Sequence, residues 1–268
     1  MKEKILLVLL VVIFGGMCFF APTGPALAKE KTIELTYSSF FPAQYGLGQA
    51  AQAWADEVGK RTNGRVKVTV FPAGTLTKAP ECYEGVVMGT SDIGQSCLAY
   101  TRGRFPLYEV VDLPGYSYNG IVTSRVAHEF YKHFKPKELA ETHVLYIHAH
   151  PPGSIVTAKK PVNNLEDLKG LRIRCTGLSS KIVEALGGTP VAMPKGDQYD
   201  ALLKGVVDGT TASTNELKGW RLAEVANYTA YYPRAGYVTA MFVTMNLAKW
   251  NSLPPISRRL SRKSARNG

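Results

Sequence analysis

Apolar and polar residues follow two different periods along the chain, and these periods take turns. Residues 32–38 and 65–71 alternate apolar and polar side chains, which is typical of half-buried strands. Between them, residues 46–61 place apolar side chains at helical spacing. Strands that alternate with helices of this length predict parallel sheets and the α/β fold class.

The same succession continues to residue 246. Further strands are predicted at 143–150, 171–175 and 238–246, with a short one beginning at Asp92. Further helices are predicted at 80–88, 121–134, 164–170, 179–186, 198–204 and 216–225. Turns are expected at 72–74 and at Val191.

One spacing occurs twice in the chain. A tyrosine is followed by a glycine six residues later and by an aspartate nine residues later, at Tyr83, Gly89 and Asp92 and again at Tyr199, Gly205 and Asp208. Both stretches read as a helix, a glycine that ends it, and a short strand. The repeat favours two similarly built lobes over coincidence between two common units. A cleft between two such lobes is a usual place for a small ligand.

The N-terminus has the pattern of an export signal. Lys2 and Lys4 precede an almost unbroken apolar stretch over residues 5–20, and Ala26-Leu27-Ala28 offers small residues for cleavage. We predict that residues 1–28 are a signal peptide cleaved after Ala28, so that the mature protein is exported. A retained membrane anchor and a lipid attached to Cys18 are the competing interpretations.

Composition and charge narrow the class of protein. The chain has 268 residues, of which 45% are hydrophobic and 20% are charged, which is an ordinary globular profile. The formal net charge is +11, but residues 256–268 hold five basic residues and no acidic one. Because the excess charge gathers in this tail, no nucleic-acid-binding face is predicted. The tail has no apolar periodicity and is predicted to be disordered.

No catalytic motif stands out. The sequence has no P-loop, no HExxH and no GxGxxG after a strand. Beyond the signal peptide, Cys82, Cys97 and Cys175 remain, and a Cys82–Cys97 bridge or three buried thiols are both open. His148 and His150 share one face of a strand, so they are either a weak metal-ligand pair or structural histidines.

The most informative segment is the strand over residues 171–175. Arg172 and Arg174 point to one of its faces and the apolar residues point to the other. Arg174 stands at the carboxyl end of the strand, where open α/β sheets bind ligands. A guanidinium is always charged and grips a carboxylate through two parallel hydrogen bonds. We therefore predict that Arg174 binds a carboxylate and that Arg172 is solvated.

Several short motifs in this order resemble one family. They are YSS at 37–39, GRVKV at 64–68, LEDLKGLRIR at 165–174, GGTPV at 187–191, MP at 193–194 and GVVDG at 205–209. Over about residues 30–255 the chain resembles the solute receptors of TRAP (tripartite ATP-independent periplasmic) transporters. The resemblance implies a two-lobed periplasmic-binding-protein fold, with lobe I at 29–150, lobe II at 151–237 and a return segment at 238–255.

The resemblance also implies a function and a site. Such receptors are periplasmic, bind a small organic acid in the cleft and deliver it to small and large membrane permease subunits, without a cofactor or metal. Arg174 would be the carboxylate clamp, and the other implied cleft residues are Ser39, Phe40, Ser96, Tyr100, Arg102, His150, Ser154, Thr176 and Thr211.

Some positions depart from the family pattern. Thr210-Thr211-Ala212 follows Asp208-Gly209 where several relatives have Gln-Glu-Asn, and residues 151–154 lack a second arginine that many relatives carry. One clamp with apolar and tyrosine neighbours suits a monocarboxylate. Relatives also continue past the position of Pro255 with further helices, so a C-terminal truncation is expected.

Two other functions are compatible with such a cleft. One is an exported enzyme that uses His150 or Asp197 as an acid–base group, although no nucleophile is evident beside either. The other is a ligand-sensing protein that works through a separate signalling partner.

Overall fold

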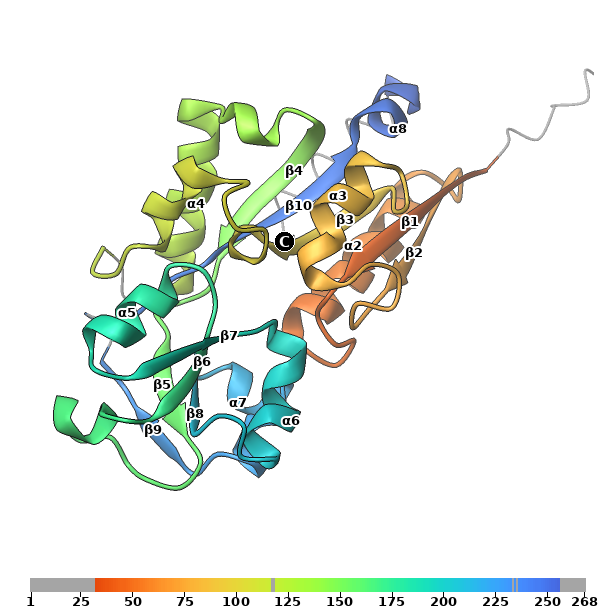
Figure 1. The fold of residues 1–268 in the computed structure, drawn as a ribbon. Coiled ribbons are helices and arrows are strands. Elements are labelled where there is room, and N and C mark those ends of the chain that lie inside the picture. Colours follow the sequence, from red (N-terminus) through yellow and green to blue (C-terminus); the bar gives the residue numbers. More distant parts are fainter. Residues whose placement is uncertain (1–31, 117–118, 233, 235, 256–268) are drawn as a thin grey trace, which may run out of the picture. The chain divides into compact units, whose positions relative to one another are not determined.

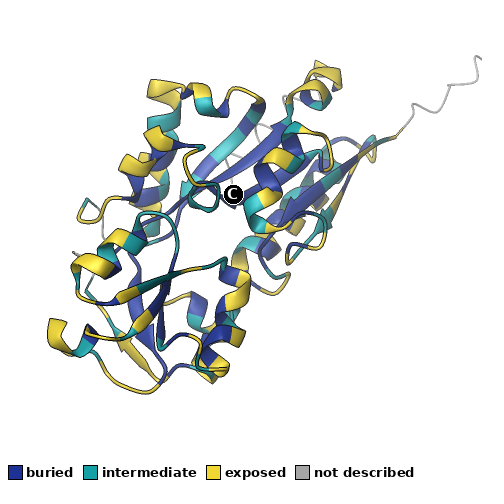
Figure 2. Ribbon diagram, in the orientation of Figure 1, coloured by how far each residue is buried: buried dark blue, intermediate teal, exposed yellow. Residues whose placement is uncertain are grey.

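The computed structural model describes residues 32–116, 119–232, 234 and 236–255 (Figure 1). Its first sheet has five strands in the order β2-β1-β3-β10-β4. Their bounds are β1 Ile33–Ser39, β2 Val66–Phe71, β3 Ile93–Cys97, β4 Thr142–Ala149 and β10 Ala240–Asn246. The chain returns from its far end to place β10 between β3 and β4, and β10 is buried along nearly its whole length (Figure 2).

The second sheet also has five strands, in the order β7-β6-β8-β5-β9. Their bounds are β5 Ser154–Thr157, β6 Arg172–Cys175, β7 Thr189–Ala192, β8 Gly209–Ala212 and β9 Tyr228–Ala230. In each sheet three neighbouring strands are parallel, and the fourth strand runs antiparallel to both of its neighbours. The prediction of parallel sheets is therefore confirmed for β2-β1-β3 and β7-β6-β8 and wrong for the pairs that β10 and β5 make, which are antiparallel.

Helices connect the strands as the α/β class requires. The α-helices are α2 Gly46–Arg61, α3 Cys82–Val87, α4 Gly120–Phe134, α5 Ser179–Ala185, α6 Gln198–Leu203, α7 Glu216–Gly219 and α8 Leu247–Ser252. Short 3₁₀ segments lie at Ala79–Glu81, Leu98–Tyr100, Pro106–Asp112, Lys137–Leu139, Leu165–Leu168, Lys195–Asp197 and Leu222–Glu224. In α2, Ala51, Ala55 and Val58 are buried at helical spacing, and this stripe packs in one core cluster with the apolar face of β1 and β2.

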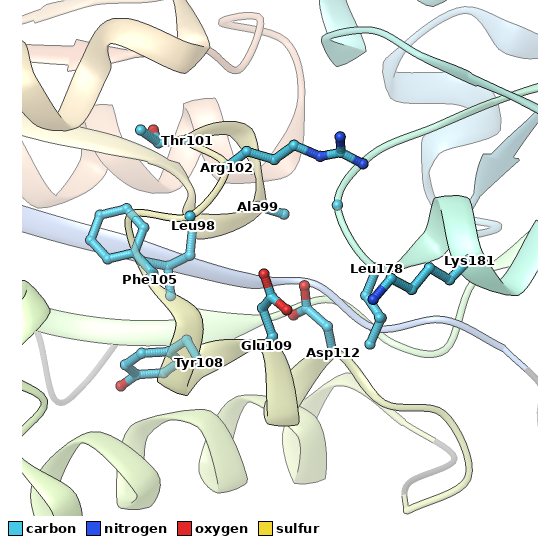
Figure 3. A pocket seen from close by; sticks show the side chains of 12 residues that line it. Leu98, Ala99, Thr101, Arg102, Phe105, Tyr108, Glu109, Asp112, Leu178 and Lys181 are labelled. Carbon is cyan, nitrogen blue, oxygen red and sulfur yellow. The ribbon is translucent and has the colours of Figure 1, made fainter.

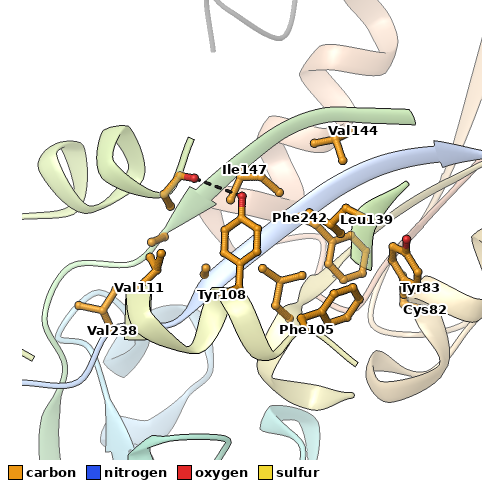
Figure 4. Packing of buried hydrophobic residues seen from close by; sticks show 14 residues of the cluster. Cys82, Tyr83, Phe105, Tyr108, Val111, Leu139, Val144, Ile147, Val238 and Phe242 are labelled. Atoms are coloured by element: carbon orange, nitrogen blue, oxygen red, sulfur yellow. Dashed lines mark hydrogen bonds between the residues drawn. The ribbon is translucent and has the colours of Figure 1, made fainter. Parts of the chain in front are cut away.

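The first sheet carries apolar cores that include aromatic residues. In the cluster of Figure 4, the rings of Tyr83, Phe105 and Phe242 meet, with edge-to-face contacts at 4.9 and 5.6 Å from Tyr83. Tyr108 is buried in the same cluster and its hydroxyl donates to the carbonyl of Ala127 at 3.4 Å. Such a core fixes β4 and β10 against the 3₁₀ segment Pro106–Asp112.

The spacing that occurs twice corresponds to one structural unit in each sheet. Gly89 and Gly205 follow α3 and α6 with φ of 78° and 67°, and the chain then enters β3 and β8. Asp92 accepts a hydrogen bond from the backbone N–H of Thr36 at 2.8 Å, and Asp208 accepts one from the N–H of Arg172 at 2.9 Å. The two units thus share helix, glycine, strand and the role of the aspartate.

Other predictions need correction. Val191 lies in strand β7, paired with Arg174, and not in a turn. The helix predicted over 216–225 is broken at Arg221, whose φ is 57°, into α7 and a 3₁₀ segment. Of the two alternatives for the cysteines, the structure has the second: Cys82, Cys97 and Cys175 are free buried thiols, without a Cys82–Cys97 bridge.

Two predictions lie outside the described residues, namely the signal peptide at 1–28 and the disordered tail at 256–268. Within the described part, none of the helices has both the length and the apolar character needed to cross a membrane.

Candidate functional site

Arg174 is buried, although it carries a permanent charge. Only 2% of the residue is exposed, whereas Arg172 on the same face of β6 is exposed and pairs with Asp208. The Arg174 guanidinium donates from Nε and Nη2 to the carbonyl of Met193, at 3.0 and 2.7 Å, and from Nη2 to Thr176 Oγ1 at 2.7 Å. Nη1 makes no hydrogen bond with any residue that the structure describes. One donor nitrogen is therefore open to a ligand.

Arg174 lines a small cavity whose walls come from both sheets. The lining residues are Phe40, Phe41, Cys97, Tyr100, His150, Arg174, Thr176, Lys195, Thr211, Glu216, Trp220, Tyr237, Thr239 and Met241. The cavity volume is about 30 Å³, whereas pockets that hold a small-molecule ligand commonly measure about 300–1,000 Å³. Because an organic acid is several times larger, a solute could enter only if the walls moved apart.

Most of the cavity wall is aromatic. The ring of Phe40 lies 5.5 Å from that of Tyr100, edge to face, and 6.1 Å from that of Trp220, to which it is nearly parallel. Tyr237 packs edge to face on His150 at 4.7 Å. Such walls offer a large apolar contact area to a ligand and exclude water from the guanidinium.

A buried ion pair also lines the cavity. Lys195 Nζ contacts Glu216 Oε2 and lies 3.3 Å from the carbonyl oxygen of Thr211. Burial lowers the pKa of Lys195, and the charge of Glu216 opposes that shift. The backbone N–H of Lys195 donates to the hydroxyl of Tyr100 at 3.2 Å, so this residue also joins the second sheet's segment to the first.

The other titratable groups of the cavity are held neutral by burial. Burial raises the pKa of Cys97 to about 12 and raises the pKa values of Tyr100 and Tyr237. Burial also lowers the pKa of His150, with the nearby Glu216 acting in the opposite direction. Although Cys97 and His150 both line the cavity, the thiolate that a cysteine–histidine mechanism needs is strongly disfavoured.

Six of the ten residues predicted for the site line this cavity together. They are Arg174, Phe40, Tyr100, His150, Thr176 and Thr211. Ser39 and Ser96 are buried and do not line it; their hydroxyls donate to Gln95 at 3.0 Å and to the carbonyl of Ala79 at 2.8 Å. Ser154 lies on β5 and lines a separate small void that it shares with Thr211 and Tyr237.

Arg102 does not line this cavity; it lines a larger one of about 510 Å³ (Figure 3) and, with Tyr100 and Thr176, a third of about 200 Å³. In the larger cavity, Arg102 and Lys181 lie opposite the carboxyl groups of Glu109 and Asp112. Arg102, Glu109 and Lys181 are exposed, so water already solvates these three charges, whereas Asp112 is buried. We assign the candidate site to the smaller cavity, because its cation is buried and its walls are apolar.

Sequence reasoning did not find the pair Lys195 and Glu216, nor the aromatic residues Trp220 and Tyr237. A lysine after a Met-Pro turn and a glutamate at the start of a short helix are ordinary surface features in a sequence. Trp220 carried the only local signal, as a large aromatic residue within a polar segment.

Two other predicted features contribute nothing to this site. Asp197 is exposed and does not line the cavity. Among the described residues, no group of three histidine, cysteine, aspartate or glutamate side chains is placed to hold a metal ion. His148 has no hydrogen-bond partner at Nε2 within this part of the chain, and burial lowers its pKa to about 4.

A comparison with known families decides how the cavity is interpreted. The family model described as bacterial extracellular solute-binding protein, family 7 (DctP), matches residues 37–267. The chain belongs to this family. The resemblance inferred from the sequence motifs is thereby confirmed, and two-lobed crystal structures of TRAP solute-binding proteins confirm the fold class.

Three relatives of the DctP family chain illustrate the similarity. A TRAP periplasmic solute-binding protein from Desulfovibrio salexigens is 38% identical to this chain, with a TM-score of 0.72. The match covers 87% of this chain and 73% of that one. That structure is an open complex in which the C-terminus of a symmetry mate is bound in the ligand-binding site. A TRAP solute-binding protein from Rhodoferax ferrireducens, in complex with copurified benzoate, is 30% identical, with a TM-score of 0.83 and coverages of 88% and 77%. The monocarboxylate 2-oxoacid-binding periplasmic protein of Nostoc is 25% identical, with coverages of 88% and 66%.

The chain spans about two thirds of the length of the curated relatives that it matches. The ligands named for those relatives are therefore properties of the full-length relatives.

Proposed function

We propose that this DctP family chain is the periplasmic solute receptor of a TRAP transporter and binds a small monocarboxylate with an apolar, preferably aromatic, body. In this proposal the Arg174 guanidinium binds the carboxylate and the aromatic walls of the cavity bind the body.

The observation that carries the proposal is the environment of Arg174. Its guanidinium is buried, and its hydrogen-bond acceptors, the Met193 carbonyl and the Thr176 hydroxyl, are both neutral. A buried charge that has only neutral partners is costly, and a carboxylate at Nη1 would remove that cost. Arg172, in contrast, already has the carboxylate of Asp208.

The aromatic walls support an apolar ligand body. Phe40, Tyr100 and Trp220 present ring faces and edges to the cavity. The Rhodoferax ferrireducens relative was isolated with benzoate, and the Nostoc relative is named for monocarboxylates. The cavity walls and the benzoate of the Rhodoferax ferrireducens relative support a compact, largely apolar body, and both relatives support a single carboxylate.

The test combines ligand identification with substitution. Mass spectrometry of the purified protein should detect a copurified monocarboxylate, and calorimetric titration with that acid, or with benzoate, should give 1:1 binding. Arg174→Ala should weaken binding by roughly 2–5 kcal/mol, as expected when a buried charge pair loses one partner. Unchanged affinity in this variant would contradict the clamp.

Two other arginines serve as controls. Arg172→Ala removes the same charge from the same strand and should leave the affinity unchanged. Arg102→Ala tests the larger cavity. A loss of affinity confined to this variant would indicate that the ligand binds in that cavity (Figure 3) and not in the smaller one.

The proposal includes export and delivery. The predicted signal peptide would place the mature protein in the periplasm, where the bound acid would pass to small and large permease subunits. Uptake of labelled ligand by cells that carry those subunits should require this chain, and uptake without it would contradict the delivery step.

A further inference from the structure

The charged groups of the Arg174 cavity add up to a single positive charge. Besides the cysteine, the tyrosines and the histidine described above, its ionisable lining residues are Arg174, Lys195 and Glu216. Lys195 and Glu216 are 6% and 5% exposed and contact each other directly. Their pair has no net charge whether the proton lies on the amine or on the carboxyl group. Arg174 therefore supplies the whole net charge of the cavity.

We propose that Glu216 is a specificity residue: by neutralising Lys195, it makes the cavity accept singly charged carboxylates and reject doubly charged ones. This inference rests on the proposed function of the same cavity, and it assigns to that function a ligand charge and the residue that sets it.

The structure holds Glu216 in place for this role. Ser213 donates to Glu216 Oε1 at 3.1 Å, and the neighbouring Asn215 donates from Nδ2 to the hydroxyl of Tyr45 at 2.9 Å. Lys195 is fixed from the other side by the Thr211 carbonyl and, through its backbone N–H, by Tyr100. A ligand could not recruit Lys195 without breaking a buried ion pair, which is strongly unfavourable.

A second carboxylate on the ligand would meet the wrong surroundings. Arg174 would be used by the first carboxylate, and Lys195 is already paired. The second charge would be buried near Glu216, which has the same sign, and an uncompensated buried charge is costly. If Glu216 lost its charge, the Lys195 ammonium would become available and the cavity would suit a dianion.

The experiment compares two probes of similar size, 4-methylbenzoate as the monoanion and terephthalate as the dianion, with butyrate and succinate as a second pair. Wild-type protein should prefer the monoanion by about 100-fold. Glu216→Gln preserves the size and one acceptor oxygen, replaces the other oxygen with an NH₂ group and removes the charge, and it should reduce this preference at least about tenfold or reverse it. Glu224→Gln, an exposed glutamate paired with Arg221, is the matched control and should keep the wild-type preference.

A charge-rescue series separates the electrostatic role from a structural one. Lys195→Met leaves Glu216 unpaired beside the ligand and should weaken monoanion binding about 100-fold. The double variant Lys195→Met, Glu216→Gln restores the net charge of the cavity and should regain most of that affinity. If Glu216→Gln does not fold, the comparison of Lys195→Met with the double variant still decides the question.

The outcomes distinguish the two levels of the proposal. Wild-type protein that binds none of the monoanions overturns the proposed function and this inference with it. Wild-type protein that binds a monoanion, together with a Glu216→Gln variant of unchanged preference or a double variant no better than Lys195→Met, overturns the role of Glu216 alone.

Discussion

At the residue scale, two arginines on one face of β6 differ because of their partners. Arg172 is exposed and holds the Asp208 carboxylate at 3.0 Å, so its charge is balanced within the fold. Arg174 is buried, and the acceptors of its hydrogen bonds among the described residues, the Met193 carbonyl and the Thr176 hydroxyl, are neutral. The position of Arg174 at the carboxyl end of the strand is the basis of the role predicted for it, whereas its burial became visible only in three dimensions.

Asp112 is a further buried ionisable group, at the larger cavity. Burial raises its pKa to about 8, against the stabilising hydrogen bond that its Oδ1 accepts from the N–H of Ala240 at 2.9 Å. Between the ordinary carboxyl pKa of 3.8 and about 8, the folded protein binds a proton that the unfolded chain does not. The free energy of unfolding should therefore fall as the pH rises through this window.

Asp112→Asn should remove this pH dependence, because the amide keeps an acceptor for Ala240 and carries no charge. The variant should be more stable than the wild type at pH 8, with a Tm higher by roughly 2–4 °C for each kcal/mol that deprotonation costs. The two proteins should have the same Tm near pH 4. Thermal unfolding at both pH values checks this, with exposed Asp197→Asn as the control; an equal difference at both pH values would disprove it.

At the element scale, the two sheets use the same unit of helix, glycine and strand. The Asp92 carboxylate accepts hydrogen bonds from the backbone N–H and the hydroxyl of Thr36, at 2.8 and 3.1 Å. These bonds connect the start of β3 to β1. Asp208 does the same for β8 and β6 through Arg172. The repeated sequence spacing thus reflects a repeated way of joining neighbouring parallel strands.

Asp92→Ala should destabilise the protein by roughly 1–3 kcal/mol, because it leaves the N–H of Thr36 without its acceptor. Urea unfolding should give this difference, while Asp56→Ala, an exposed aspartate on α2, should change the free energy of unfolding by no more than about 0.5 kcal/mol. Equal effects of the two substitutions would show that the Asp92–Thr36 contact contributes nothing.

The elements that were predicted and those that were missed differ in what stabilises them. Helix α2 was predicted at residues 46–61 because its buried residues are apolar and recur at helical spacing in the local sequence. Strand β7 was missed because Gly188 and Pro190 suggest a turn, while its pairing with β6 decides the outcome. Likewise, Lys195 and Glu216 come together only through tertiary contacts, so no local sequence pattern could predict the pair.

At the scale of the whole binding unit, contacts between the two sheets close the candidate site. The side chain of Asn215 donates to Tyr45, and the backbone of Lys195 donates to Tyr100. These contacts surround a cavity of about 30 Å³, which is too small for a monocarboxylate. Ligand entry therefore requires these contacts to open, and contacts that a bound ligand makes with both sheets would favour their closing again.

Gly219 tests this closure at one position. It ends α7, and a Cβ there would overlap Cδ2 of the Tyr45 ring, which belongs to the first sheet's side of the contact. Gly219→Ala should hold the two sides apart while leaving each sheet intact. Ligand affinity should then fall by at least about tenfold, or about 1.4 kcal/mol, because the ligand would contact only one side of the cavity.

Gly46→Ala, where a Cβ meets nothing within 4 Å, is the control with the same added methyl group. Calorimetry would measure the affinity, and small-angle X-ray scattering with ligand would report whether the protein still becomes more compact. A Gly219→Ala variant that binds as tightly as the control, with the same compaction, would show that closure at Tyr45 is not part of ligand binding.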